Sequence, residues 1–151
     1  MNAQTKIRAA RPSPAYDADG YGWAMAQAEL LRARRFDDVD WANVIEEIES
    51  VGKSERSSVE SALRVVLMHQ LKWEHQKMFR ARSWANSIRT HLGHFDDRLS
   101  DNPGLKSQLS SILQRAYRDA RSEAANETGI DIDLFPVDPP SWDEIRAPRE
   151  L

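Results

Sequence analysis

The chain has 151 residues, of which 40% are hydrophobic and 30% charged, the composition of an ordinary globular domain. Its 21 basic and 24 acidic residues give a net charge of −3, which argues against a uniformly basic nucleic-acid-binding protein and against a highly charged disordered chain. The lack of cysteine excludes a disulfide scaffold, a thiolate nucleophile and a zinc site with sulfur ligands.

Composition divides the chain into one domain and two short ends. We expect a loose N-terminal tail over residues 1–15, a single helical domain over 16–146 and a C-terminal tail over 147–151. The longest strongly apolar run, residues 65–68, is far shorter than the ~20 residues that cross a bilayer, and no apolar stretch follows the basic residues near the N-terminus. We therefore expect a cytoplasmic protein without a membrane partner.

Apolar side chains recur at helical spacing between these ends, and no segment alternates as a strand does. Ser83 and Asn102 stand where helix N-caps are expected, and Gly129 stands where a C-cap is expected. The sequence thus predicts an all-α antiparallel bundle of about four helices. The predicted elements are helices over residues 19–34, 41–74, 83–100 and 103–128, and a short turn over 141–146.

The predicted helix over residues 41–74 carries the longest apolar stripe. The stripe keeps its phase at 100° per residue for 33 residues and contains no proline, as expected of one unbroken helix. We expect a single central helix about 50 Å long that turns this stripe toward the core of the bundle. The stripe consists of Trp41, Val44, Ile45, Ile48, Gly52, Glu55, Val59, Ala62, Leu63, Val66, Gln70 and Trp73.

Several motifs along these helices resemble those of one bacterial family. They include Glu46-Glu47-Ile48-Glu49, Gly52-Lys53, His69-Gln70-Leu71-Lys72-Trp73, Ser83-Trp84, Asp101-Asn102-Pro103-Gly104-Leu105, Glu127-Thr128-Gly129 and Phe135-Pro136. With this set the chain resembles the bacterial domain-of-unknown-function family number 29, over about residues 16–145. The resemblance implies an all-helical bacterial protein, and it implies no activity, cofactor or catalytic residue.

Glu55 is the charged residue within the apolar stripe. Burial of an unpaired carboxylate costs several kcal/mol, so Glu55 needs either a partner or water. Three interpretations stay open: a general base or metal ligand inside the bundle, a structural ion pair with Arg89 or Arg121, and an open bundle in which Glu55 is hydrated. Gly52, one turn earlier, indicates a close approach of a neighbouring element, or else a bend or a gap for a ligand.

The spacing of histidines and glutamates gives little support for a metal centre. His91 and His94 lie three residues apart and could share a ligand, but no carboxylate on that helix is spaced to join them. Glu46 and Glu49 have the spacing of a magnesium-binding helical pyrophosphatase, but the sequence contains no Glu-x-x-Asp pair to serve as the second one. No histidine follows a glutamate by three residues, as di-iron bundles require. We expect no cofactor, and His91 and His94 are the weak candidates for a metal.

Arg64 and His69 match the Arg-x4–6-His spacing of a metal-independent helical ribonuclease. The composition of the chain produces roughly one such match by chance, and on an unbroken helix the two side chains diverge by about 140°. His69 is therefore either a catalytic candidate together with Glu55 or a structural histidine beside the core.

A basic stretch separates the second and third predicted helices. Lys77, Arg80, Arg82 and Arg89 lie near Trp84 in the sequence. Cations before a helix N-terminus suit an anion or a phosphate backbone, and aromatic rings can stack on bases. The alternative is a solvated loop that neutralises acidic segments elsewhere in the chain.

Three functions follow from these features. We favour a non-enzymatic protein-interaction or regulatory module that binds itself or another protein, because no catalytic constellation is complete. An exposed tryptophan at either end of the long helix, Trp41 or Trp73, would mark the partner surface. The alternatives are a nuclease-like enzyme that acts on phosphoesters or nucleic acid through Glu55, His69 and the cations over 80–89, and a nucleic-acid-binding module without catalysis.

Overall fold

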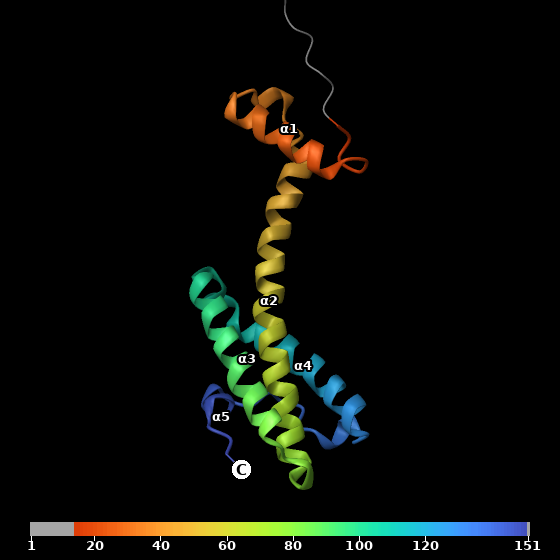
Figure 1. Ribbon diagram of the computed structural model, residues 1–151, viewed down its shortest axis with the longest axis vertical. Coiled ribbons are helices and arrows are strands. Elements are labelled where there is room, and N and C mark those ends of the chain that lie inside the picture. Colours follow the sequence, from red (N-terminus) through yellow and green to blue (C-terminus); the bar gives the residue numbers. More distant parts are fainter. Residues whose placement is uncertain (1–13, 151) are drawn as a thin grey trace, which may run out of the picture. The chain divides into compact units, whose positions relative to one another are not determined.

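The computed structural model describes residues 14–150 (Figure 1). Within this range the regular elements are α-helices and short 3₁₀ helices, and no strand is present. The predicted all-α helical bundle is confirmed. The predicted loose tail over residues 1–15 lies almost entirely outside the described residues.

Five α-helices follow one another within residues 14–150. The long helix predicted over residues 41–74 is confirmed as α2, which runs without interruption from Trp41 to His75. The α-helices are α1 (Gly20–Arg32), α2 (Trp41–His75), α3 (Arg82–Asp101), α4 (Leu109–Thr128) and α5 (Trp142–Arg146). The 3₁₀ helices are η1 (Phe36–Asp38), η2 (Lys77–Phe79), η3 (Pro103–Gln108) and η4 (Ile132–Leu134).

The helix ends agree with the sequence in part. Gly129 ends α4 in the left-handed conformation with φ of 71°, as predicted. The N-cap predicted at Ser83 is wrong, because α3 begins one residue earlier and its N-cap, Ala81, makes no side-chain cap bond. The cap predicted at Asn102 is also wrong, since its side-chain amide donates to Arg98 O at 3.0 Å and a 3₁₀ helix precedes α4.

The chain divides into two compact units, residues 1–51 and 52–151, with the boundary inside α2. We call them the N-terminal unit and the C-terminal unit. The single domain expected over residues 16–146 stays a prediction.

The C-terminal unit holds the main apolar core. The second part of α2 lies between α3 and α4, and α5 comes back against the bundle (Figure 1). Trp142 of α5 stacks on Phe95 of α3 with ring centroids 5.7 Å apart, and Ile145 is fully buried. A capping box between Ser141 and Glu144 starts this short helix. The largest fully buried side chains are Leu63, Leu67, Phe95, Ile112, Phe135 and Ile145.

The N-terminal unit is small and is held largely by polar contacts. Trp23 of α1 is buried and donates its indole Nε1–H to Asp40 Oδ2 at 3.1 Å. The buried Gln27 accepts from the Asp40 backbone N–H at 2.8 Å. Tyr16 packs edge-on against Trp23 and donates its hydroxyl to Glu47 Oε1 at 2.5 Å, a bond that raises the pKa of Tyr16 to about 12. These contacts join α1 to the start of α2.

The apolar stripe of α2 is buried along its second part and exposed along its first. From Val59 onward the stripe contributes to the core, whereas residues 45–55 are all exposed. The expectation that the stripe faces the core along the predicted helix is therefore wrong for this stretch. Periodicity shows which face of a helix can be buried, but not whether another element covers that face.

No helix among the described residues has both the length and the apolar character that crossing a bilayer requires.

Candidate functional site

A row of large apolar side chains lies on one side of the first part of α2. Trp41, Ile45, Ile48 and Val51 are between 47% and 67% exposed. At 100° per residue they fall within about 120° of the helix circumference, so they form one continuous strip. We call this strip the exposed α2 face.

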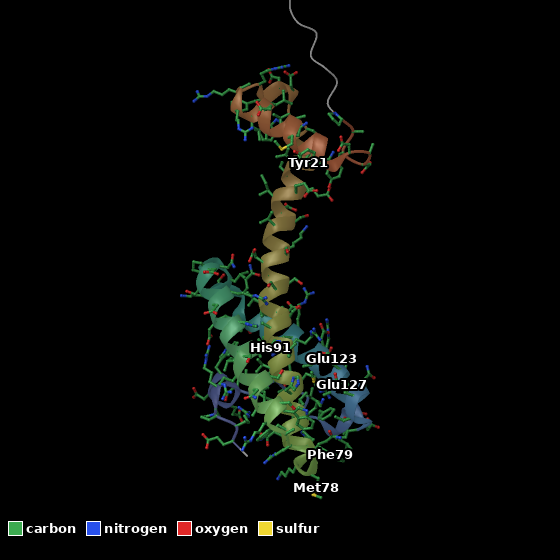
Figure 2. All side chains as sticks on the ribbon, viewed as in Figure 1. Tyr21, Met78, Phe79, His91, Glu123 and Glu127 are labelled. Atoms are coloured by element: carbon green, nitrogen blue, oxygen red, sulfur yellow. The ribbon has the colours of Figure 1, made fainter. Side chains whose placement is uncertain are left out.

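Further exposed apolar residues lie in the same unit. Tyr21 and Met25 of α1 are exposed, and so is Phe36 of η1 (Tyr21 is labelled in Figure 2). The indole of Trp41 donates to Phe36 O at 3.0 Å, and the rings of Trp41 and Phe36 lie 6.5 Å apart. Trp41 is thus held in place while almost half of its surface stays open. Trp41 is thus an exposed tryptophan at one end of the long helix, which is the feature expected to mark a partner surface.

The part of the chain that carries this apolar surface is rich in acidic residues. Residues 14–51 contain nine acidic and three basic residues, a net charge of −6. Glu46, Glu47 and Glu49 lie on the same stretch of helix as the exposed α2 face. A partner that covers the apolar strip therefore meets a strongly negative border.

Glu55 is exposed, which is the third of the alternatives that the sequence left open. Its Oε2 accepts a hydrogen bond from the Asn102 side-chain amide at 2.9 Å, and no arginine pairs with it among the described residues. Gly52 has open space around it, because a Cβ built there meets no atom within 4 Å. The close approach expected at Gly52 is therefore wrong.

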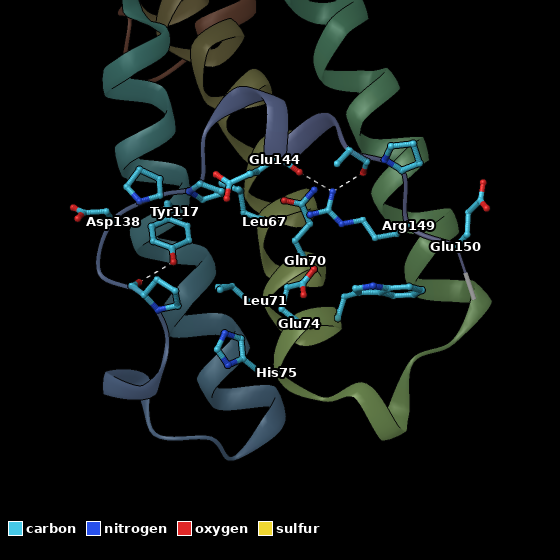
Figure 3. Close-up of a pocket in the computed structure, with 16 residues that line it drawn as sticks. Leu67, Gln70, Leu71, Glu74, His75, Tyr117, Asp138, Glu144, Arg149 and Glu150 are labelled. Carbon is cyan, nitrogen blue, oxygen red and sulfur yellow. Dashed lines mark hydrogen bonds between the residues drawn. The ribbon is translucent and has the colours of Figure 1, made fainter.

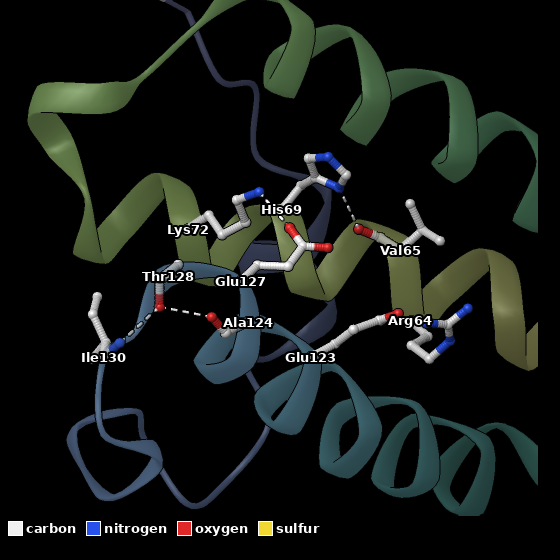
Figure 4. A network of polar contacts seen from close by, with 9 residues as sticks. All are labelled: Arg64, Val65, His69, Lys72, Glu123, Ala124, Glu127, Thr128 and Ile130. Carbon is white, nitrogen blue, oxygen red and sulfur yellow. Dashed lines mark hydrogen bonds and ion pairs between the residues drawn. The ribbon is translucent and has the colours of Figure 1, made fainter.

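His69 is half-buried on α2 within a polar network (Figure 4). Its Nδ1 donates to Val65 O at 3.0 Å. Burial lowers the pKa of His69, and Lys72 lowers it further, against the opposing effects of the Val65 hydrogen bond and of Glu127. Lys72 pairs with Glu127 at 2.6 Å.

The candidate residues for nuclease-like chemistry do not come together. Arg64 is engaged by Glu123 of α4 rather than directed at a site with His69. Glu55 and His69 are fourteen residues apart on one uninterrupted helix, which separates them by roughly 21 Å along its axis. Two groups at that separation cannot act on the same bond.

The two candidate metal ligands lie side by side without a third. The rings of His91 and His94 are 5.5 Å apart, and His91 Nδ1 donates to Ser87 O at 2.9 Å. Nowhere in residues 14–150 do three histidine, aspartate or glutamate side chains gather in a way that could hold a metal ion. The pair alone supplies too few ligands for a protein zinc site.

The basic stretch forms the turn between α2 and α3. Arg80 is engaged, because its Nε donates to Trp73 O at 2.9 Å and its guanidinium lies 4.9 Å from the centre of the Trp73 ring. Arg89 bonds its own helix neighbour Asn86 at 2.6 Å. The half-buried Trp84 lies under the ammonium of Lys72 at 4.8 Å and so has one face occupied.

Two cations of this turn remain unengaged. In the part of the chain that the structure describes, Lys77 and Arg82 are exposed and have no hydrogen-bond or ion-pair partner. Met78 and Phe79 lie between them and are 94% and 68% exposed (Figure 2). We call these four residues, together with Arg80, the α2–α3 tip.

A cleft of about 680 Å³ opens in the C-terminal unit between α2, α4 and the C-terminal segment (Figure 3). The buried Gln70 donates its Nε2 to Ile145 O at 2.7 Å, while its Oε1 is buried without a partner. Arg149 closes one side and donates to Glu144 O at 2.8 Å and to Ala147 O at 2.6 Å. The cleft has the size of a small-molecule site, but Gln70, Tyr117 and Arg149 in its lining are engaged with backbone carbonyls.

Comparison with known proteins adds the family. The model of a family described as domain of unknown function DUF29 matches residues 15–146, which is most of the chain. The chain belongs to the DUF29 family. The resemblance seen in the sequence is thus confirmed. Neither the curated proteins nor the solved structures contain a significant match.

Sequence reasoning missed two features of this DUF29 chain. Three residues of the exposed α2 face, Trp41, Ile45 and Ile48, continue the phase of the buried stripe and so belong to the predicted core, whereas Val51 lies outside that stripe. The exposure of Met78 and Phe79 also went unnoticed, although their position in a short turn between two helices was a usable signal. The family description names no activity, so the function must be argued from these surfaces.

Proposed function

We propose that this DUF29 chain is a non-enzymatic protein-interaction module that binds a partner protein through the exposed α2 face. The observation that carries the proposal is the row of four large apolar side chains along one side of a regular helix, each about half exposed or more. Single exposed apolar residues are ordinary on protein surfaces, whereas a contiguous row on one helix face is typical of helix-recognition surfaces. No catalytic role is proposed, because Glu55 and His69 are not assembled into a site.

The charge of the N-terminal unit indicates the chemistry of the partner. A second copy that used the same face would bring two negatively charged units together, each with a net charge of −3 over residues 1–51 and −6 over residues 14–51, and like charges at an interface oppose binding. A basic amphipathic helix would instead place its apolar side on the exposed α2 face and its cations near the surrounding carboxylates. We infer that the partner offers such a helix.

The test uses two helical peptides about 18 residues long with the same leucine face, one with lysine and one with glutamate on the polar side. Fluorescence anisotropy measures their binding to the full chain. We expect the lysine peptide to bind more tightly than the glutamate peptide. The double variant Ile45→Gln, Ile48→Gln should weaken the binding of the lysine peptide at least about tenfold, because it removes two central apolar contacts.

The matched control is Val137→Gln, which removes an exposed apolar side chain of the C-terminal unit and should leave binding unchanged. Light scattering coupled to size-exclusion chromatography reports self-association in the same samples. A dimer that the double variant dissociates would assign the exposed α2 face to a second copy of the chain instead of a basic helix. A monomer that binds the lysine peptide equally well with and without Ile45 and Ile48 would overturn the interaction function.

A further inference from the structure

The α2–α3 tip presents an apolar pair in a fixed, outward position. The 3₁₀ helix η2 is closed by the Phe79 N–H, which donates to Gln76 O at 2.9 Å. Arg80, directly after η2, connects the turn to the end of α2: its Nε donates to Trp73 O, and its guanidinium lies over the Trp73 ring. These contacts hold the backbone of the turn, and Met78 and Phe79 are exposed on it with no described segment of the unit over them.

The cations of the tip set the charge of the surface that it fits. Lys77 and Arg82 are exposed and unpaired within the described residues, and they lie on either side of the apolar pair. Arg80 adds a third positive charge, offset in part by its ion pair with Glu74 at 3.8 Å. The tip thus combines two projecting apolar side chains with a positive border.

This combination matches an anionic lipid surface better than a nucleic acid. A bilayer interface takes up apolar side chains at the level of its headgroups and attracts basic residues through its negative surface potential. Nucleic-acid binding depends on many phosphate contacts and on rings that stack on bases. The tip has two unengaged cations, the methionine has no ring to stack, and Trp84 has one face covered by Lys72.

We propose that the α2–α3 tip is a peripheral binding site for membranes that contain anionic lipid, with Met78 and Phe79 inserted at the headgroup level and Lys77 and Arg82 facing the headgroups. Contact at the surface of a bilayer needs no membrane-spanning segment, so this proposal concerns a different kind of membrane contact from the one that the sequence argues against. The proposal uses residues of the C-terminal unit alone and does not depend on the exposed α2 face.

The experiment is co-sedimentation of the full chain with vesicles of equal parts phosphatidylglycerol and phosphatidylcholine, compared with pure phosphatidylcholine. We expect binding to the anionic vesicles that weakens as salt is raised, since screening shortens the reach of surface charge. The double variant Met78→Ser, Phe79→Ser should lower the partition coefficient at least about tenfold, because two large apolar side chains no longer leave water. Lys77→Gln with Arg82→Gln should remove the preference for anionic vesicles.

The control is Leu134→Ser with Val137→Ser, which removes another exposed apolar pair, 68% and 76% exposed, from the same unit and should change the partition coefficient less than about twofold. Circular dichroism of each variant confirms the helical fold. Wild-type protein that fails to sediment with anionic vesicles would overturn the proposal, and so would binding that the Met78 and Phe79 variant retains. Binding of a single-stranded RNA of about 20 nucleotides that depends on Lys77 and Arg82, without vesicle binding, would replace lipid by nucleic acid.

Discussion

At the scale of single residues, the environment of His69 makes stability depend on pH. Burial is the main cause that lowers the pKa of this imidazole, with a smaller contribution in the same direction from Lys72. The unfolded chain therefore binds the proton at a higher pH than the folded chain does. Stability from this group is complete above the unfolded value of about 6.5 and is lost as the pH falls through the lower folded value.

We predict that the free energy of unfolding decreases between about pH 7.5 and about pH 5, and that His69→Gln reduces this decrease. Urea unfolding followed by circular dichroism at each pH measures the difference. The control is His94→Gln, which removes an exposed histidine of α3 and should leave the pH profile of the wild type intact. Equal profiles for wild type and His69→Gln would mean that the imidazole is as well solvated in the folded chain as in the unfolded one.

At the scale of elements, α2 contains a stretch that no apolar core covers and that Tyr16 and Asn102 contact only through hydrogen bonds to Glu47 and Glu55. Residues 45–55 are exposed on all sides, and isolated helices of this length are marginal in water. We predict fast amide exchange over residues 45–55 and slow exchange over 59–71, where the core covers the helix. Hydrogen exchange followed by mass spectrometry resolves the two segments.

Gly52 offers a way to change this stretch without touching a neighbour. Alanine at this position meets open space and gains about 1 kcal/mol of helix propensity, so Gly52→Ala should slow exchange over residues 45–55 roughly fivefold. Gly93→Ala adds the same methyl group to an exposed site of α3 and should leave that stretch unchanged. Exchange over 45–55 as slow as over 59–71 in the wild type would show that the exposed stretch is covered in solution.

The elements also show what local sequence determines. The extent of α2 was predictable because an unbroken phase without proline admits one helix, and Gly129 was predictable because a C-cap needs a positive φ. The start of α3 was not, since the bonds from Trp84 and Ala85 to Ala81 O extend the helix past the expected cap. The cleft in Figure 3 depends on residues as far apart as Gln70 and Ile145, and no local pattern joins them.

The exposure of the two candidate surfaces could not be predicted from local sequence either. The residue types of the exposed α2 face and of the tip were visible in the sequence, but their exposure depends on which elements reach them. Ile48 continues the stripe of Val59 and Val66, yet the core begins only at Val59. Glu55 is a charged residue within an apolar stripe, but because that stretch of the helix is exposed its carboxylate is not buried. A hydrophobic pattern shows which face of a helix can be buried, and tertiary contacts determine which faces remain exposed.

At the scale of the whole molecule, the two open surfaces have opposite chemistry. The exposed α2 face lies in a unit whose described residues carry a net charge of −6, whereas the tip carries the unengaged cations Lys77 and Arg82. A basic partner is therefore drawn to the first surface and repelled from the second, and an anionic surface behaves in the reverse way. The two proposals together predict that one chain holds a basic protein partner at an anionic membrane.

This arrangement predicts that the two binding activities are separable. Ile45→Gln with Ile48→Gln should weaken binding of the lysine peptide and leave vesicle partition unchanged, and Met78→Ser with Phe79→Ser should do the opposite. The quadruple variant should lose as much peptide binding as the first double variant and as much vesicle partition as the second, because changes at sites that share no partner are additive. Fluorescence anisotropy measures peptide binding and co-sedimentation measures vesicle partition. Both are applied to the wild type, the two double variants and the quadruple variant. Loss of peptide binding in the Met78 and Phe79 variant would instead place both activities on one surface, the tip, and would leave the exposed α2 face without a ligand.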